Sequence, residues 1–189
     1  MSSHASEAAD ISPSNKKIAL LISILALFLA LSEINGKQAE NDSVARNIEA
    51  SNLWSFFQAK TIRRSDAIVA AETMAVNMAG VQDQAAKASM QKQIDAWRAN
   101  ATRLDSEPET GEGRKELMVR AKAAEASRDF LKHKNEKYEM ASGLFQIAIV
   151  VASASIITGI GLLALAGGGL GVIGICLMGL AIFAPTALF

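Results

Sequence analysis

Hydrophobic and polar positions divide this chain into an apolar beginning, a charged middle and an apolar end. An apolar run over residues 18–31 follows Lys16 and Lys17, and residues 140–189 contain no Asp, Glu, Lys or Arg. A membrane-spanning helix needs about 20 apolar residues, so the end has room for two spans and a turn. Backbone groups in a bilayer must bond within the segment, which favours helices. We expect spans at 16–35, 142–165 and 170–186, with a glycine turn at 166–169.

The first apolar run has the charge and length of a signal peptide core. It lacks a small-x-small cleavage site and continues through Ser32 and Glu33 into sequence compatible with a helix. We therefore predict a retained span, and residues 1–15, which are rich in Ser and Ala, as a disordered tail.

The middle, residues 36–141, has the composition of helices, with many Ala, Glu, Lys, Gln and Met residues and only Pro108 as a proline. Two breaks are expected, one near Gly80 and one in the polar cluster at 106–113. At about 1.5 Å per residue, the helix before Gly80 and the segments after it have similar lengths, roughly 65 and 75 Å. The simplest prediction is an all-α membrane protein with a long, coiled-coil-like helical hairpin between the first and second spans. A compact three-helix bundle, or a four-helix version with a break near Ser65 and Asp66, is the alternative.

Charge and chemistry exclude several classes of function. The chain has 19 basic and 19 acidic residues, which argues against general nucleic-acid binding. Its two histidines, His4 and His133, have no metal-ligand companions, and Cys176 is the one cysteine. No nucleophile elbow or phosphate-binding loop is present. We expect no catalytic, metal-binding or cofactor-binding residues and no enzyme; for the acidic loop at 107–112, a solvated turn is favoured over a weak Ca²⁺ site.

An aromatic stretch in the middle segment is the sharpest local feature. Four large apolar residues spread over roughly 160° of a helix that turns about 100° per residue, so one partner helix cannot bury all of them. We expect them to pack against the returning arm and also to form an oligomer or partner interface. These residues are Leu53, Trp54, Phe56 and Phe57.

Small residues recur at spacings of three and four in the last two spans, which places them on one helix face. Such faces let helices approach closely in lipid. We predict tight packing of the two spans through Ala148, Ala152, Ser155 and Gly159 on one and Gly167, Gly171 and Gly174 on the other.

Glu33 is the acidic residue nearest to a span. A charged group inside a bilayer usually serves a function, so Glu33 is a candidate for a polar pathway. Its place at the end of the span favours the plainer interpretation, an interfacial carboxylate that reaches water or Lys37 at the i+4 spacing.

Orientation follows from the positive-inside rule. Lys16 and Lys17 before the first span favour a cytoplasmic N-terminus. Four cations before the second span favour instead a cytoplasmic location for the helical middle: Arg128, Lys132, Lys134 and Lys137. Because long segments translocate largely regardless of charge, we give the first span more weight and expect the helical middle to be periplasmic.

Four segments, residues 49–63, 92–97, 106–117 and 144–150, carry a resemblance to a known family. In them the chain resembles the bacterial membrane proteins of domain-of-unknown-function family four-three-three-seven, and the resemblance covers the chain from about Lys16 onward. It implies three spans, a helical middle and a bacterial inner (plasma) membrane, and it implies no activity.

Two functions remain. The first is a non-enzymatic, homo-oligomeric scaffold in membrane lipid that presents its hairpin to an unidentified protein partner. The second is a subunit of an oligomeric channel or transporter, with Glu33 and the small-residue faces along a pathway.

Overall fold

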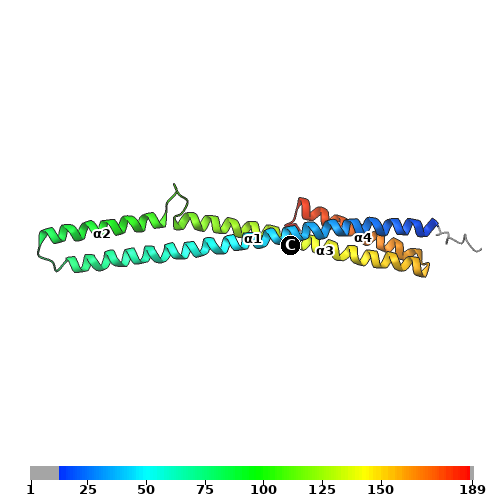
Figure 1. The fold of residues 1–189 in the computed structure, drawn as a ribbon, viewed down its shortest axis with the longest axis horizontal. Helices are drawn as coiled ribbons and strands as arrows, with labels where there is room; N and C mark the ends of the chain where they lie inside the picture. The colour runs from blue at the N-terminus through cyan, green and yellow to red at the C-terminus, as the bar shows by residue number, and fades with distance from the viewer. Residues whose placement is uncertain (1–12, 188–189) are drawn as a thin grey trace, which may run out of the picture. The chain divides into compact units, whose positions relative to one another are not determined.

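The expected all-α class is confirmed by the computed structural model, which describes residues 13–187 (Figure 1). Within these residues the chain forms four helices and no strand: α1 (Pro13–Met78), α2 (Gln84–Asp105), α3 (Arg114–Thr158) and α4 (Gly161–Phe183). Residues 1–12 of the predicted disordered tail at 1–15, His4 among them, lie outside the described residues. The tail prediction is wrong for its last residues, because α1 already begins at Pro13, and proline suits the first position of a helix.

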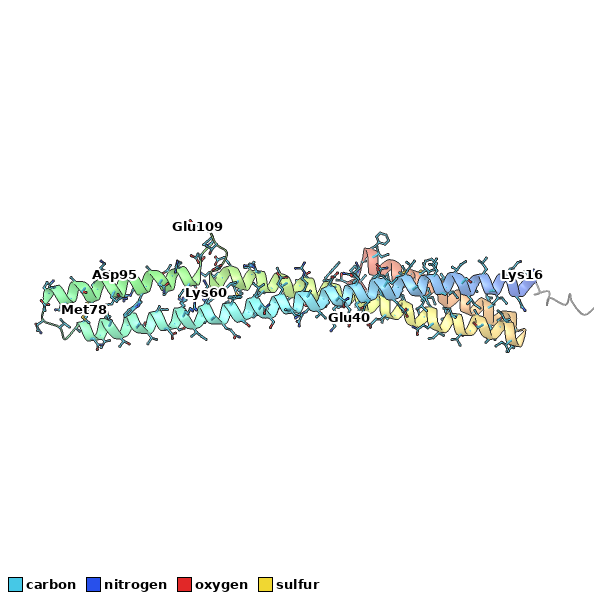
Figure 2. The ribbon with its side chains drawn as sticks, in the orientation of Figure 1. Lys16, Glu40, Lys60, Met78, Asp95 and Glu109 are labelled. Atoms are coloured by element: carbon cyan, nitrogen blue, oxygen red, sulfur yellow. The ribbon has the colours of Figure 1, made fainter. Side chains whose placement is uncertain are left out.

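The first helix continues without interruption through Gly36 and through Ser65 and Asp66. The alternative with a break near Ser65 is therefore wrong. The chain reverses over residues 79–83, and the Asp83 carboxylate caps α2 by accepting hydrogen bonds from the backbone N–H groups of Ala85 and Ala86 (3.3 and 3.0 Å). Met78, at the end of α1, is labelled in Figure 2.

Contacts divide the chain into two units. One comprises Met1–Ser43 and Asp129–Phe189 and is called here the apolar unit; the other, Val44–Arg128, is called the charged unit. Helices α1 and α3 contribute to both units, α4 belongs to the apolar unit, and α2 belongs to the charged unit.

In the apolar unit, α1, α3 and α4 share a packed core. Leu25, Ala141, Phe145 and Ala148 are buried together, and the rings of Phe28 and Phe145 stack with their centroids 6.0 Å apart. Small residues thus let large side chains from the neighbouring helices fill the space between the backbones.

Glycines set how closely α4 approaches its neighbours. A Cβ atom at Gly171 would overlap Leu25 of α1, and one at Gly167 would lie 2.8 Å from the Ala148 carbonyl oxygen of α3. A Cβ at Gly174 would lie 2.7 Å from the Phe145 ring. Helix α4 therefore packs against both α1 and α3, where the sequence predicted a contact between the last two spans.

The turn between the last two helices is not at 166–169, and that prediction is wrong. Helix α3 ends at Thr158 and α4 begins at Gly161, so the predicted turn lies inside α4. Gly159 has φ +72°, a left-handed conformation that glycine adopts without steric cost, and its N–H donates to the Ser155 carbonyl oxygen (3.0 Å). The Ser155 hydroxyl also donates to the Ile160 carbonyl oxygen (2.9 Å). Residues 167–169 lie within α4 instead, and of these three glycines only Gly167 allows a close approach that a side chain would block.

The outer surface of the apolar unit is itself apolar. Among its exposed side chains are Leu20, Leu27, Ile34, Val150 and Leu162, each more than half exposed. Helices α1, α3 and α4 are long and apolar enough to cross a membrane. A hydrocarbon solvent would match these exposed side chains at no hydrophobic cost.

The charged unit is a helical hairpin in which the return arm is split. The second half of α1 lies beside α2, and Ala67, Ala71 and Ile94 are buried there (Figure 1). Closer to residue 44, α1 packs instead against the first half of α3 through a cluster of Ala50, Leu53, Leu117, Ala121 and Ala124. Residues 106–113 form the loop between the two pieces of the return arm, with Glu109 at its outer end (Figure 2).

Candidate interaction site

The aromatic stretch on α1 is divided between the interior and the surface of the charged unit. Leu53 is buried, and Trp54 and Phe57 pack half-buried against the same cluster. Phe56 faces outward and is 63% exposed. The structure thus places three of the four aromatic-stretch residues against the returning arm and one on the surface.

Polar groups fix the two half-buried rings. The Trp54 Nε1–H donates a hydrogen bond to Glu125 Oε1 (2.9 Å), and the Trp54 and Phe57 rings meet edge to face with centroids 5.3 Å apart. The Arg114 guanidinium lies over the Phe57 ring, 5.5 Å from its centroid. Such aromatic and cation–π contacts are directional, so they hold α1 in register with α3.

A groove of about 420 Å³ runs beside Phe56. Leu53 and Leu117 supply apolar walls, and the cationic side chains Lys60, Arg63 and Arg120 surround it together with Glu112. We call it the Phe56 groove. Its net charge is positive, because three cations face one carboxylate.

Two of the three cations beside the groove have partners in the loop. The Lys60 Nζ lies 3.8 Å from Glu112 Oε2, and Arg120 donates to the Gly111 carbonyl oxygen at 3.5 Å. Arg63 is exposed and makes no ion pair within residues 13–187. The groove therefore combines an exposed aromatic ring with an exposed guanidinium, and aromatic residues and arginine are both enriched at protein interfaces.

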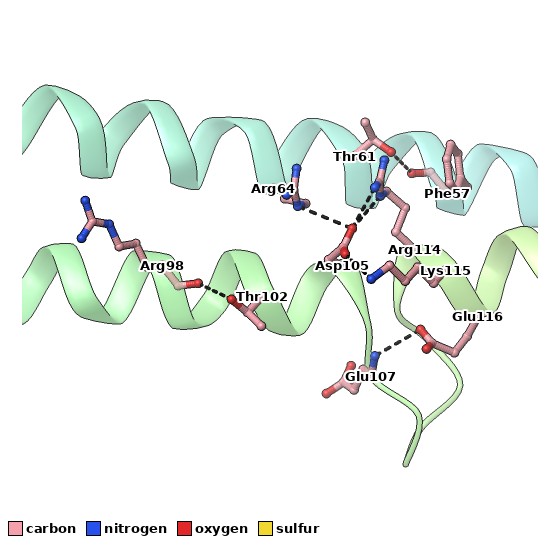
Figure 3. A network of polar contacts seen from close by, with 10 residues as sticks. All are labelled: Phe57, Thr61, Arg64, Arg98, Thr102, Asp105, Glu107, Arg114, Lys115 and Glu116. Carbon is pink, nitrogen blue, oxygen red and sulfur yellow. Dashed lines mark hydrogen bonds and ion pairs between the residues drawn. The ribbon is translucent and has the colours of Figure 1, made fainter.

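Asp105 ties the loop to three surrounding cations (Figure 3). Its Oδ1 lies 2.8 Å from Arg114 Nη2 and 3.6 Å from Arg64 Nε, and its Oδ2 lies 2.9 Å from Lys115 Nζ. Hydrogen bonds from Lys115 and then Arg114 hold the pKa of Asp105 below its ordinary value. The carboxylate thereby joins the end of α2 to the start of α3.

Glu116 closes the same loop from the other side. It accepts hydrogen bonds from the Ser106 hydroxyl (2.7 Å) and from the Glu107 backbone N–H (3.1 Å), as Figure 3 shows for Glu107. The start of the acidic loop at 107–112 is thus held to α3 by hydrogen bonds to the Glu116 carboxylate. No group of three His, Cys, Asp or Glu residues in the described part of the chain is arranged to hold a metal ion.

All but one of the residues on the predicted small-residue faces of the last two spans are buried. Ala148, Ala152 and Ser155 are buried on α3, and Gly167, Gly171 and Gly174 are buried on α4. Gly159 is exposed in the turn and belongs to neither face, so its assignment to the α3 face is wrong. Its spacing from Ser155 is helical, but the helix ends before it.

Glu33 lies on the outside of the apolar unit and not in its core. Its carboxylate accepts a hydrogen bond from Gln146 Nε2 on α3 (3.3 Å). The suggested partner Lys37 instead pairs with Glu40 at 2.8 Å. The partner of Glu33 therefore lies on α3, and residue spacing within α1 could not predict it.

Sequence reasoning missed a close contact between α1 and α3. The buried Ser32 hydroxyl donates to the Tyr138 carbonyl oxygen (2.9 Å), and a Cβ at Gly36 would lie 3.1 Å from the Tyr138 Cβ. Nearby Lys137, one of the cations that precede the predicted second span, is fully buried. The small residues Ser32, Gly36 and Ala39 follow the four-and-three spacing seen in α4, and that signal was present in the sequence.

Over residues 13–187 these features define an all-helical protein, with three helices long and apolar enough to cross a membrane and with one charged helical segment. The chain belongs to the family described as Domain of unknown function (DUF4337), whose model matches residues 14–184. No curated protein and no solved structure matches the chain.

Proposed function

We propose that the chain is a non-enzymatic scaffold of the bacterial inner membrane. In this proposal α4 and the apolar parts of α1 and α3 cross the bilayer, and the charged unit lies in water as a coiled-coil-like hairpin. The exposed apolar surface of the three helices supports the first part, since water would not solvate it. The nearly balanced charges of residues 44–128 support the second.

The scaffold assembles as a homo-oligomer through the Phe56 groove. The observation that carries this step is Phe56 itself: its three aromatic-stretch neighbours are packed within the hairpin, whereas its ring is exposed beside Arg63. A partner surface must then be apolar at its centre and acidic at its edge. The charged unit carries exposed acidic residues, among them Glu72 and Glu109, which a second copy can supply.

The oligomer is tested by the mass of the detergent-solubilised protein from light scattering. Phe56→Ser and Arg63→Glu should each shift the mass toward the monomer, because one removes the apolar contact and the other reverses a charge. Val76→Ser is the matched control, since Val76 is a similarly exposed apolar side chain (75%) further along α1. An unchanged mass for both groove variants, or an equal shift for Val76→Ser, would refute assembly through this groove.

A further inference from the structure

A second groove, of about 430 Å³, continues the Phe56 groove along α1 in the charged unit. Ala67 and Ala70 of α1 lie on one side of it, and Trp97 and Leu104 of α2 lie on the other. We call it the Trp97 groove. Arg63 lines both grooves, so the two meet at this residue.

The spacing of the lining residues shows that the two grooves share one face of α1. Phe56, Lys60 and Arg63 line the first groove, and Arg63, Ala67 and Ala70 line the second, in steps of four and three residues. Residues at these spacings lie on one face of a helix. At about 1.5 Å per residue, the stretch from Phe56 to Ala70 is roughly 21 Å long. The joined grooves therefore form one elongated surface.

Interface size requires a bound copy to cover more than the Phe56 groove. A stable, specific interface involves about 20–30 residues on each side. Eight residues line the Phe56 groove, which is too few. Eight also line the Trp97 groove, and Arg63 is common to both, so the joined surface has fifteen. A copy bound at Phe56 therefore has to extend over neighbouring surface, and the Trp97 groove is a concave surface that adjoins it.

The charge of the Trp97 groove has the same sign as that of the Phe56 groove. Arg63 and Arg103 lie on its lining with one carboxylate, that of Asp66. The Arg103 Nη1 lies 3.8 Å from Glu107 Oε1, whereas Arg63 makes no ion pair within residues 13–187. A partner with an acidic edge, which the Phe56 groove calls for, therefore suits both grooves.

Trp97 differs from Trp54 in what its side chain offers to a partner. The Trp54 Nε1–H donates to Glu125, and the Trp54 ring packs against the cluster within the hairpin. Trp97 is half-buried on the lining of its groove, and its Nε1–H donates no hydrogen bond within the described residues. Tryptophan and arginine are enriched among the residues that carry most of the binding energy at interfaces. Trp97 thus has both a donor and part of its ring open to a partner.

We infer that the second copy of the chain covers the Trp97 groove as well as the Phe56 groove. Arg63 then lies at the centre of the contact, with the Phe56 ring on one side and the Trp97 ring on the other. The identity of the occupant rests on the proposed function. The inference adds α2, through Trp97, to the surface at which the copies meet.

Tryptophan fluorescence tests this contact directly, because the chain has two tryptophans. In the full-length, detergent-solubilised Trp54→Phe variant, Trp97 is the one remaining reporter. Acrylamide should quench it severalfold less in the assembled protein than after dilution to the monomer mass, because a partner that covers the ring excludes water and quencher. Its emission should also shift to shorter wavelength on assembly.

Trp97→Phe is the matched control, because it leaves Trp54 as the reporter. Trp54 is already packed within the hairpin, so its quenching should be the same in the assembled and the diluted protein. Equal quenching of Trp97 in the two states would overturn the inference, and it would do so even if detergent shielded the ring in both.

A substitution in the groove provides a second test. Ala70→Glu places a carboxylate opposite the acidic edge of the partner and should raise the dissociation constant of the assembly roughly tenfold or more. Ala99→Glu is the control, since Ala99 is exposed on α2 and lines neither groove. Circular dichroism should show parental helicity for both variants. A folded Ala70→Glu protein that assembles as tightly as Ala99→Glu would overturn the inference.

The two proposals fail in different ways. An unchanged mass for both Phe56→Ser and Arg63→Glu would refute assembly through the Phe56 groove, and the inference with it. Dissociation of those two variants, together with unchanged quenching of Trp97 and unchanged assembly of Ala70→Glu, would refute the contact at the Trp97 groove alone.

Discussion

Asp105 shows how one side chain fixes the break in the return arm. It lies at the last position of α2 and pairs with cations from α1 and from the start of α3, so its charge matters more than its bulk. Sequence analysis predicted the break at 106–113 from its turn-forming residues. The partners of Asp105 could not be predicted, because they depend on the register of α1 against the return arm.

The pKa of Asp105 makes a prediction about pH. In the folded chain, hydrogen bonds from Lys115 and Arg114 lower this pKa, so the carboxylate stabilises the fold above the ordinary aspartate pKa of about 4. That contribution is lost as pH falls through the lowered value. Asp105→Asn should therefore reduce the melting temperature clearly at pH 7 and less at pH 3, as measured by circular dichroism. The control is Asp95→Asn, whose carboxylate accepts a hydrogen bond from Gln91 in the same helix. It should change the melting temperature at pH 7 much less than Asp105→Asn does; equal effects of the two variants would contradict the assignment.

At the scale of the elements, glycine serves two purposes, a turn between helices and a close contact between helices, and the sequence alone did not distinguish them. Glycine permits both a left-handed turn and a close helix contact, and an apolar span offers few polar residues to distinguish them. Three successive glycines at 167–169 suggested a turn, yet the chain turns at Gly159, between the end of α3 and the start of α4. Helix ends in the charged segment were easier to predict, because Asp83 and the residues around Pro108 are polar markers.

The packing role of α4 glycines predicts unequal effects of one substitution. Gly174→Ala places a Cβ 2.7 Å from the Phe145 ring and should lower thermal stability in detergent, since overpacking costs about 1–3 kcal/mol. Gly169→Ala is the matched control in the same helix, because a Cβ there would meet no atom within 4 Å. It should leave stability unchanged or raise it, as alanine favours helices. If Gly174→Ala were as stable as Gly169→Ala, the close contact of α4 with Phe145 would be wrong.

At the scale of the whole molecule, the proposed arrangement depends on an odd number of crossings. Three spans place the two ends of the chain on opposite sides of the membrane, and they place Val44–Arg128 on the side opposite the N-terminus. The balance of positive charge around the spans was ambiguous in the sequence.

This arrangement predicts which positions a membrane-impermeant thiol reagent reaches in intact bacterial cells with a permeabilised outer membrane. In a Cys176→Ala background, Glu109→Cys should be labelled from outside, because Glu109 is exposed on the loop of the charged unit. Ser3→Cys should be labelled only after the inner membrane is lysed, because we expect the N-terminus in the cytoplasm. The reverse pattern would show the opposite orientation. Labelling of both positions from outside would place the N-terminus and the charged unit on the same side of the membrane. Only the predicted first span lies between them, so this result would show that α1 does not cross the membrane.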